Sequence, residues 1–191
     1  MKKVKFLFHL IRLIPHLILY KTSSNKEIIQ YDVNRWLSLT NVDNKLGFVG
    51  LMTYLPEFRN VFYKRLGRSS SFVRWLCPPM NTLFITTNNI GPGLFIQHGF
   101  ATIISAKSIG KDCWINQQVT IGYSNETDAP TLGDNVVINA GAKIIGKVHM
   151  GDNSHAGANA VVVKNVPNDC TVVGVPAYIV KRNGVKVHEK L

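Results

Sequence analysis

The stretch INAGAKIIGKVHMGDNSHAGANAVVVKNVP (138–167) carries an apolar residue at every sixth position. An α-helix repeats every 3.6 residues and a half-buried strand every two, so neither produces a clean step of six. The same step extends beyond this stretch, with one gap. The apolar residues that keep this six-residue step are Ile109, Ile115, Ile121, Leu132, Ile138, Ile144, Met150, Ala156 and Val162.

A six-residue step is typical of a triangular β-solenoid, in which each hexapeptide supplies a short strand and a turn, and three complete a coil. An earlier run, Phe84, Ile90 and Ile96, keeps the step but lies one residue out of phase with Ile109. We therefore predict a mainly β fold whose coils bury one another by stacking. Glycines directly after stacked positions are expected to turn tight corners without a side-chain clash. They are Gly110, Gly122, Gly133, Gly151 and Gly157.

The gap in the repeat is the segment YSNETDAPT (123–131). A solenoid accommodates an insertion only by extending it outward, and such loops often carry the binding function. We expect this segment to be an exposed loop close to a functional site.

Basic residues are concentrated in the first part of the chain. The 191 residues hold 22 Lys+Arg and 11 Asp+Glu; up to Arg74 the count is 13 against 4, which leaves 9 against 7 for the rest. A basic region suits nucleic acid, an anionic membrane surface or acidic substrates. Because no recognition helix and no interleaving of aromatic and basic residues appears, we predict no nucleic-acid partner.

The N-terminal segment MKKVKFLFHLIRLIPHLILYK (1–21) mixes basic and apolar residues. It lacks a small-residue cleavage site, and its apolar run is too interrupted for a membrane-spanning helix. Two interpretations remain open: a helix lying at an anionic membrane interface, or a helix packed on its own domain or on a partner subunit. In the first, the buried residues would be Phe6, Leu7, Leu10, Ile11, Leu13 and Ile14.

We predict a basic, mostly helical region at 1–79, a solenoid at 80–181 and a tail at 182–191. Ser24 and Glu27 have capping-box spacing at the start of a helical stretch. A second helix is expected from about Leu46 to Phe62, broken near Pro56. The serines and prolines of segment 69–79 indicate the joint between the parts.

The cysteines and histidines form no metal-binding pattern. Cys77, Cys113 and Cys170 have no paired spacing, and we expect them to be reduced and buried in a cytoplasmic protein. The six histidines are scattered, so we predict no metal site. Three of them lie outside the solenoid and are expected to be solvated or interfacial: His9, His16 and His188.

Five motifs carry a resemblance to a known family. They are HGFATII (98–104), INQQVTIG (115–122), NAGAKIIG (139–146), GANAVVVKNVP (157–167) and GVPAYIV (174–180). Over about 84–181 the chain resembles the hexapeptide-repeat acyltransferases, in their serine acetyltransferase-like branch. The resemblance implies a left-handed parallel β-helix that forms a homotrimer. It also implies acetyl-CoA as co-substrate in the groove between neighbouring coils, and active sites at subunit interfaces.

The resemblance places the catalytic histidine at His98. An imidazole can take the proton of a hydroxyl as it attacks a thioester, because its pKa lies near neutrality. Gln97, Gln117 and Asp128 are candidate acceptor-binding residues. Asp128, which could accept a hydrogen bond from a sugar hydroxyl or orient His98, is a second candidate catalytic residue. His149 and His155 lie at turn corners, where we expect exposed side chains without a direct role.

For acetyl-CoA, the resemblance points to the main chain near Ala140, Gly141 and Ala158, where small residues would let the pantetheine arm lie flat. Phosphate contacts are expected from three basic side chains. They are Lys164, Lys181 and Arg182.

The chain departs from serine acetyltransferases at the acceptor. Those enzymes have Asp before the catalytic His, where this chain has Gln97, and an Arg-His pair where it has Asp128 and Ala129. An Asp in place of Arg would repel the carboxylate of serine. We therefore favour an O-acetyltransferase that modifies a sugar or glycan in cell-surface polysaccharide synthesis, peripheral to the membrane if its acceptor is lipid-linked. The alternatives are a serine O-acetyltransferase of cysteine biosynthesis and a non-catalytic hexapeptide-repeat protein of assembly or binding.

Overall fold

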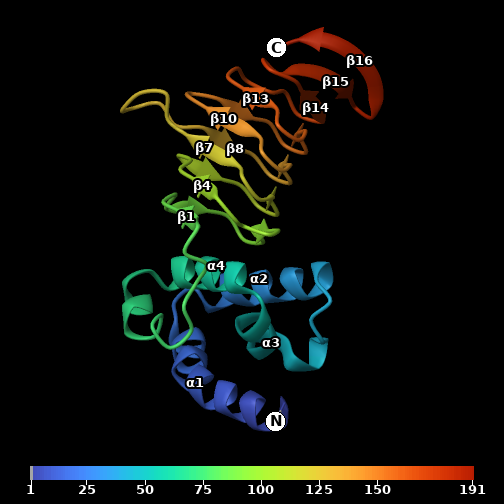
Figure 1. Ribbon diagram of the computed structural model, residues 1–191. Helices are drawn as coiled ribbons and strands as arrows, with labels where there is room; N and C mark the ends of the chain where they lie inside the picture. The colour runs from blue at the N-terminus through green and yellow to red at the C-terminus, as the bar shows by residue number, and fades with distance from the viewer. Residues whose placement is uncertain (1) are drawn as a thin grey trace. The chain divides into compact units, whose positions relative to one another are not determined.

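The structure is a computed structural model that describes residues 2–191, with side chains in the first helix from Leu10 onward. The chain divides into two compact units, residues 1–81 and 82–191. The first unit is helical and the second is built of short strands (Figure 1). Each unit is described by itself below.

The helical unit follows the predicted periodicity with one error at a helix start. Pro56 opens a new helix after a break at Leu55, as predicted. The capping box of Ser24 and Glu27 does not form, because the second helix begins one residue later, after Asn25. Its elements are α1 (Lys2–Thr22), α2 (Lys26–Leu39), η1 (Asn44–Leu46), α3 (Gly47–Tyr54), α4 (Pro56–Leu66) and η2 (Gly67–Phe72).

Aromatic rings fill the core of the helical unit. Phe48 contacts the edges of Phe58 and Phe62, with ring centroids 6.1 and 4.9 Å apart. Arg65 donates to the buried Asp32 at 2.8 Å and so balances a carboxylate that would otherwise be costly to bury. Packing of the apolar helix faces around these rings supplies most of the stability of such short helices.

His16 does not lie in solvent or at an interface, and that prediction is wrong. Its ring is fully buried, and Nε2 lies 2.9 Å from the hydroxyl of Tyr63. The Tyr63 hydroxyl donates onward to the carbonyl of Cys77 at 2.7 Å. The imidazole therefore belongs to a buried polar chain, where burial lowers its pKa. His9 lies outside the described side chains.

The solenoid unit consists of three parallel sheets that form the faces of a prism. The first sheet has the order β1-β4-β7-β10-β13, the second β11-β8-β5-β2, and the third runs from β3 through β6, β9 and β12 to β14, β15 and β16. The strands are β1 (Leu83–Ile85), β2 (Asn89–Ile90), β3 (Phe95–Ile96), β4 (Thr102–Ile104), β5 (Ser108–Ile109), β6 (Trp114–Ile115), β7 (Thr120–Gly122), β8 (Thr131–Leu132), β9 (Val137–Ile138), β10 (Lys143–Ile145), β11 (His149–Met150), β12 (His155–Ala156), β13 (Val161–Val162), β14 (Cys170–Val173), β15 (Tyr178–Arg182) and β16 (Val185–Lys190).

The predicted stacking of aliphatic residues is confirmed from Ile90 onward. Ile115 aligns with Ile96 on one side and with Ile138 on the other, and all three are buried. Phe84 is the exception, because its side chain is 56% exposed. It aligns with Ile103 on the outer surface, while its neighbour Ile85 aligns with the buried Ile104. The step from Ile85 to Ile90 is five residues rather than six, so the assumed phase was wrong by one.

The glycines after stacked positions are required mostly by the close approach of the next coil. A Cβ on Gly110 would lie 2.5 Å from the carbonyl carbon of Gly133, whereas one on Gly122 would meet nothing within 4 Å. The left-handed turns at this corner fall instead on Asn and Asp, as at Asn135 and Asn153, each with φ of 56°. Their short polar side chains tolerate that conformation.

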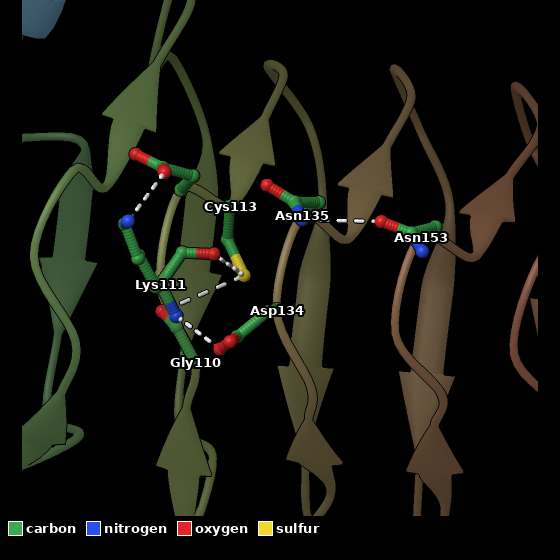
Figure 2. Close-up of polar contacts among 7 residues, drawn as sticks. Gly110, Lys111, Cys113, Asp134, Asn135 and Asn153 are labelled. Carbon is green, nitrogen blue, oxygen red and sulfur yellow. Dashed lines mark hydrogen bonds and ion pairs between the residues drawn. The ribbon is translucent and has the colours of Figure 1, made fainter.

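A polar ladder follows this corner along the solenoid (Figure 2). Nδ2 of Asn135 donates to Oδ1 of Asn153 at 3.1 Å, and Nδ2 of Asn153 donates to Asp169 at 2.9 Å. Asp134 accepts from the backbone N–H of Lys111 at 2.7 Å, and the Sγ of Cys113 donates to the Gly133 carbonyl at 3.2 Å. Side chains thus connect coils that the main chain already pairs.

The last strands end the parallel stack. β14 and β15 pair antiparallel, and β15 pairs antiparallel with β16. Residues predicted as a tail after Lys181 therefore form the end of β15 and the whole of β16. All three cysteines are free and buried, as predicted. Among the helices described, none combines the length and the apolar content that crossing a bilayer requires.

Gly110 and Gly122 provide a test of whether coil spacing requires glycine after a stacked residue. Gly110→Ala should lower the free energy of unfolding by about 1–3 kcal/mol, because the new methyl group overlaps the next coil. Gly122→Ala, which also follows a stacked isoleucine, should leave stability unchanged or slightly raised. Denaturant unfolding of both variants measures the difference. Equal effects would show that coil spacing does not select these glycines.

Candidate active site

One corner of the prism gathers most of the residues that the resemblance singles out. We call it the His98 corner: it joins the third sheet to the first through segments 97–101, 116–119, 139–142 and 157–160. Main-chain bonds stack these segments, since Gly141 N–H donates to the Gln117 carbonyl at 3.0 Å and Asn159 N–H to the Ala140 carbonyl at 2.9 Å. His98, Gln117, Ala140, Gly141 and Ala158 therefore lie along one edge.

His98 stands out from this edge because its segment is longer than the others. Ile96 and Ile104 are eight positions apart, while Ile115 and Ile121, with which they align, are six apart. The extra residues place His98 in a left-handed conformation with φ of 61° and leave its side chain exposed. Among the residues whose side chains the structure describes, the imidazole has no hydrogen-bond partner, so both ring nitrogens are open to a ligand.

Two glutamines flank the histidine along the chain and across the coils. Gln97 is half-buried, and its backbone N–H donates to the Ile115 carbonyl at 2.9 Å. Gln117 is half-buried one coil further along the corner. An amide offers both a donor and an acceptor but no charge, so these side chains suit a hydroxyl or an amine of an acceptor.

The predicted cofactor-binding residues Ala140, Gly141 and Ala158 form a strip of small residues along the His98 corner. Gly141 has φ of 76°, and a Cβ there would lie 3.1 Å from Cγ of Asn159 and overlap its Oδ1. Ala140 and Ala158 add only methyl groups on either side. These three positions therefore contribute nothing larger than a methyl group to the corner, and the Asn159 side chain lies against Gly141.

The three basic candidates do not converge. Nζ of Lys164 donates to the main-chain carbonyl of Leu191 at 2.7 Å. Both residues line a cavity of about 400 Å³, together with Tyr178 and His188. Arg182 forms an ion pair with Glu189 at 2.6 Å. Lys181 lines a different cavity of about 380 Å³ with His155, whose pKa is lowered mainly by partial desolvation of the ring and then by the Lys181 charge. Of the three basic candidates, only Lys164 lines the larger cavity.

Asp128 lies at a different corner from His98. Its loop, residues 123–131, joins β7 to β8 and is mostly exposed, as predicted. The Asp128 carboxylate accepts from the backbone N–H groups of Ser124 at 2.8 Å and Asn125 at 2.9 Å, and from the Ser124 hydroxyl. These hydrogen bonds, the one from the Ser124 hydroxyl most of all, lower the pKa of Asp128. Within the chain that the structure describes, none of its hydrogen bonds reaches His98.

Sequence reasoning missed two contacts that shape these corners. Ser124 is the partner that organises Asp128, and a serine four residues before an aspartate in a loop was the available signal. Nζ of Lys143 donates to the Gln118 carbonyl at 2.6 Å and so braces the His98 corner from β10. That contact spans 25 residues and has no local signal in the sequence.

The remaining histidines occupy other faces. His149 is exposed on β11, where Nδ1 lies 3.0 Å from the hydroxyl of Thr131. His155 is exposed on β12. Among residues whose side chains are described, no group of three or more His, Cys, Asp or Glu is placed to hold a metal ion.

Comparison with known proteins gives no matching family model. In sequence, the chain is 44% identical over 102 residues to the serine acetyltransferase of Synechococcus elongatus, covering 51% of this chain and 42% of that protein. It is also 44% identical over 102 residues to the enzyme of Staphylococcus aureus strain Mu50, covering 48% of that protein. The chain thus spans about half the length of the curated relatives it matches.

Solved structures match over more of the chain. Serine acetyltransferase from Neisseria gonorrhoeae in complex with serine has a TM-score of 0.71 and 25% identity, covering 87% of this chain and 73% of that one. A serine acetyltransferase in complex with CoA has a TM-score of 0.66 and 26% identity, covering 85% and 72%. The helical region followed by a parallel β-solenoid is therefore an arrangement that this chain shares with serine acetyltransferases.

Proposed function

We propose that the chain is an acetyl-CoA-dependent serine O-acetyltransferase with His98 as its general base. The observation that carries the proposal is the His98 imidazole, which is exposed and has no hydrogen-bond partner among the described side chains. It stands on a corner with two additional residues, in a solenoid that resembles serine acetyltransferases in sequence and in fold. A histidine side chain supplies what O-acetylation needs, namely a base that can take the hydroxyl proton during attack.

The reaction follows from the chemistry of the two substrates. A ring nitrogen of His98 takes the proton of the acceptor hydroxyl while the oxygen attacks the thioester carbonyl. The resulting oxyanion requires hydrogen-bond donors, and the main-chain N–H groups of a solenoid corner are the groups available. When the carbonyl re-forms, the C–S bond breaks and the CoA sulfur takes the proton from the imidazolium. No acyl-enzyme forms, so no nucleophilic side chain is required.

The strip at Ala140, Gly141 and Ala158 is the part of the corner that fits acetyl-CoA. A thioester lying there would come close to His98, because the same corner carries both. The CoA complex of the structural relative supports this assignment for the co-substrate. Lys164 would meet a phosphate if the segment at Leu191 moved, since its ammonium already has an oxygen partner. Arg182 already forms an ion pair with Glu189, so it is a weaker candidate than Lys164 for contact with a cofactor phosphate.

The acceptor favoured by the sequence alone was a glycan, and the comparisons do not support it. They favour serine, the alternative, through relatives named for that activity and one solved with serine. The charge argument against serine also weakens, because the Asp128 carboxylate already accepts from two main-chain N–H groups and the Ser124 hydroxyl of its own loop, and these donors partly offset its charge. Gln97 and Gln117 remain as neutral groups beside His98, and a zwitterion can hydrogen-bond to both.

A trimer would bring the two corners together. Within one chain the loop 123–131 and His98 lie at different corners of the prism, so one subunit does not supply both to one site. A threefold arrangement in which the loop of one copy lies at the His98 corner of the next would join both in one site. We therefore retain the homotrimer as part of the proposal.

The acceptor is tested by following thiol release from acetyl-CoA with serine, galactosides and nucleotide sugars. We expect kcat/KM for serine to exceed that of every sugar, and thiol release without acceptor to be negligible. Asp128→Asn, which keeps an oxygen for the loop N–H groups, should change serine use by less than about threefold, because the loop donors already offset the charge of Asp128. A sugar that outperforms serine would restore the glycan hypothesis.

The base is tested at His98 with a variant matched to its backbone. Asn tolerates the left-handed conformation of this position, so His98→Asn removes the imidazole with little strain. We expect kcat to fall by about 10²-fold or more while acetyl-CoA affinity stays nearly unchanged. His149→Asn, on the exposed face of β11, is the control and should keep parental activity. Retention of most of the rate by His98→Asn would refute the assignment.

The shared site is tested by mixing subunits. Asp128→Ala removes the carboxylate that accepts the loop N–H groups and should raise KM for the acceptor. Co-expression of His98→Asn and Asp128→Ala subunits should give mixed trimers more active than either variant alone, since some sites receive His98 and an intact loop from different chains. Activity no higher than the average of the two separate variants, or a monomeric mass in light scattering with full parental activity, would contradict the interfacial site.

A further inference from the structure

One side of helix α1 packs into the helical unit, and another side exposes apolar residues. Leu13 is 1% exposed and His16 is fully buried, so these residues fix the helix to its unit. Ile11, Ile14 and Ile18 are 60%, 52% and 57% exposed. Their spacing of three and four residues puts them in one row along the helix. We call this the isoleucine row.

The chain around this row carries only positive charge. Residues 1–26 contain six Lys+Arg and no Asp or Glu, and Glu27 is the first acidic residue of the sequence. Lys21 is exposed in the last turn of α1, three residues beyond Ile18, and continues the row. Apolar side chains and a cation thus share one exposed helix surface.

We propose that the isoleucine row docks the helical unit on an anionic lipid bilayer. A bilayer interface offers acyl chains to the isoleucines and headgroup phosphates to Lys21 at the same depth. Each basic residue near such a surface adds to the attraction. Lys21 and Lys26 are both exposed, whereas the Arg12 guanidinium donates to Cys77 and takes no part. An interface with another copy of this chain would instead bring like-charged segments together.

The geometry of the row sets the orientation of the helix. From Ile11 to Ile18 the row extends about 10 Å along the axis at 1.5 Å per residue. All three side chains reach a flat surface together only when the axis lies parallel to it. α1 therefore lies on the bilayer and does not cross it. This modifies the interfacial interpretation of the sequence, because Leu13 is buried within the protein and takes no part, while Phe6 and Leu7 lie outside the described side chains.

Co-sedimentation with vesicles tests the proposal on the full-length chain. We expect binding to vesicles of phosphatidylcholine mixed with phosphatidylglycerol, and none to phosphatidylcholine alone. Binding should be lost near 1 M salt, where the Debye length is about 3 Å. The variant Ile11→Ser/Ile14→Ser/Ile18→Ser should bind the anionic vesicles at least about tenfold more weakly. Its helical circular dichroism should match the parent, since all three side chains are exposed.

A matched control removes other exposed apolar groups of the same unit. Tyr54→Ser/Phe72→Ser/Trp75→Ser changes three comparably exposed aromatic residues and should leave vesicle binding intact. A single-site pair gives the same comparison with less change to the helix: Ile18→Asp should abolish binding and Ile18→Lys should retain it.

Three results would overturn the proposal. The first is parental vesicle binding by both the triple isoleucine variant and Ile18→Asp. The second is loss of binding in the aromatic control rather than in the isoleucine variant. The third is a fall in the molar mass of the isoleucine variant, measured by light scattering without vesicles, which would show that the row joins copies of the chain. Because vesicle binding is measured without substrates, none of these results depends on the proposed acetyl transfer.

Discussion

The spacing of successive coils, set by main-chain hydrogen bonds between parallel strands, is the constraint on which the solenoid depends. Neighbouring strands of a sheet lie about 4.8 Å apart. At that distance the corner after Ile109 has no room for a Cβ, and each interior position must fill a layer of fixed height. Aliphatic residues at the stacked positions and short Asn or Asp residues at the left-handed turns follow from it. The polar ladder through Asn135 and Asn153 reinforces the same spacing.

The candidate active site lies where the chain departs from this regular spacing. Two additional residues raise His98 out of its corner, and the insertion at 123–131 leaves the prism between β7 and β8. A rigid scaffold supports both, because the segments on either side remain in register. Catalytic groups held this way need little ordering when substrates bind, and that lowers the entropic part of the barrier.

The sequence was most informative where structure is periodic. The stacked residues from Ile90 to Val162 and the outward loop could be predicted, since each depends on spacing along the chain. The phase at Phe84 could not, because a corner one residue shorter leaves no mark in a short apolar run. Periodicity does not identify hydrogen-bond partners. It therefore did not predict that His16 is buried against Tyr63 or that Asp128 accepts from main-chain N–H groups of its own loop. The resemblance located His98, and the phase shift between Ile96 and Ile109 showed an added residue between them but not which corner holds it.

The antiparallel end of the third sheet also limits what the solenoid can join. A parallel stack that simply stopped at β14 would expose unpaired N–H and C=O groups to the first coil of another molecule. β15 covers those groups in the opposite direction, and β16 then presents Lys186 and Lys190 on the outermost strand. Strand direction and edge charge together disfavour fibre growth from this end, so a protein made of repeating coils keeps a defined length.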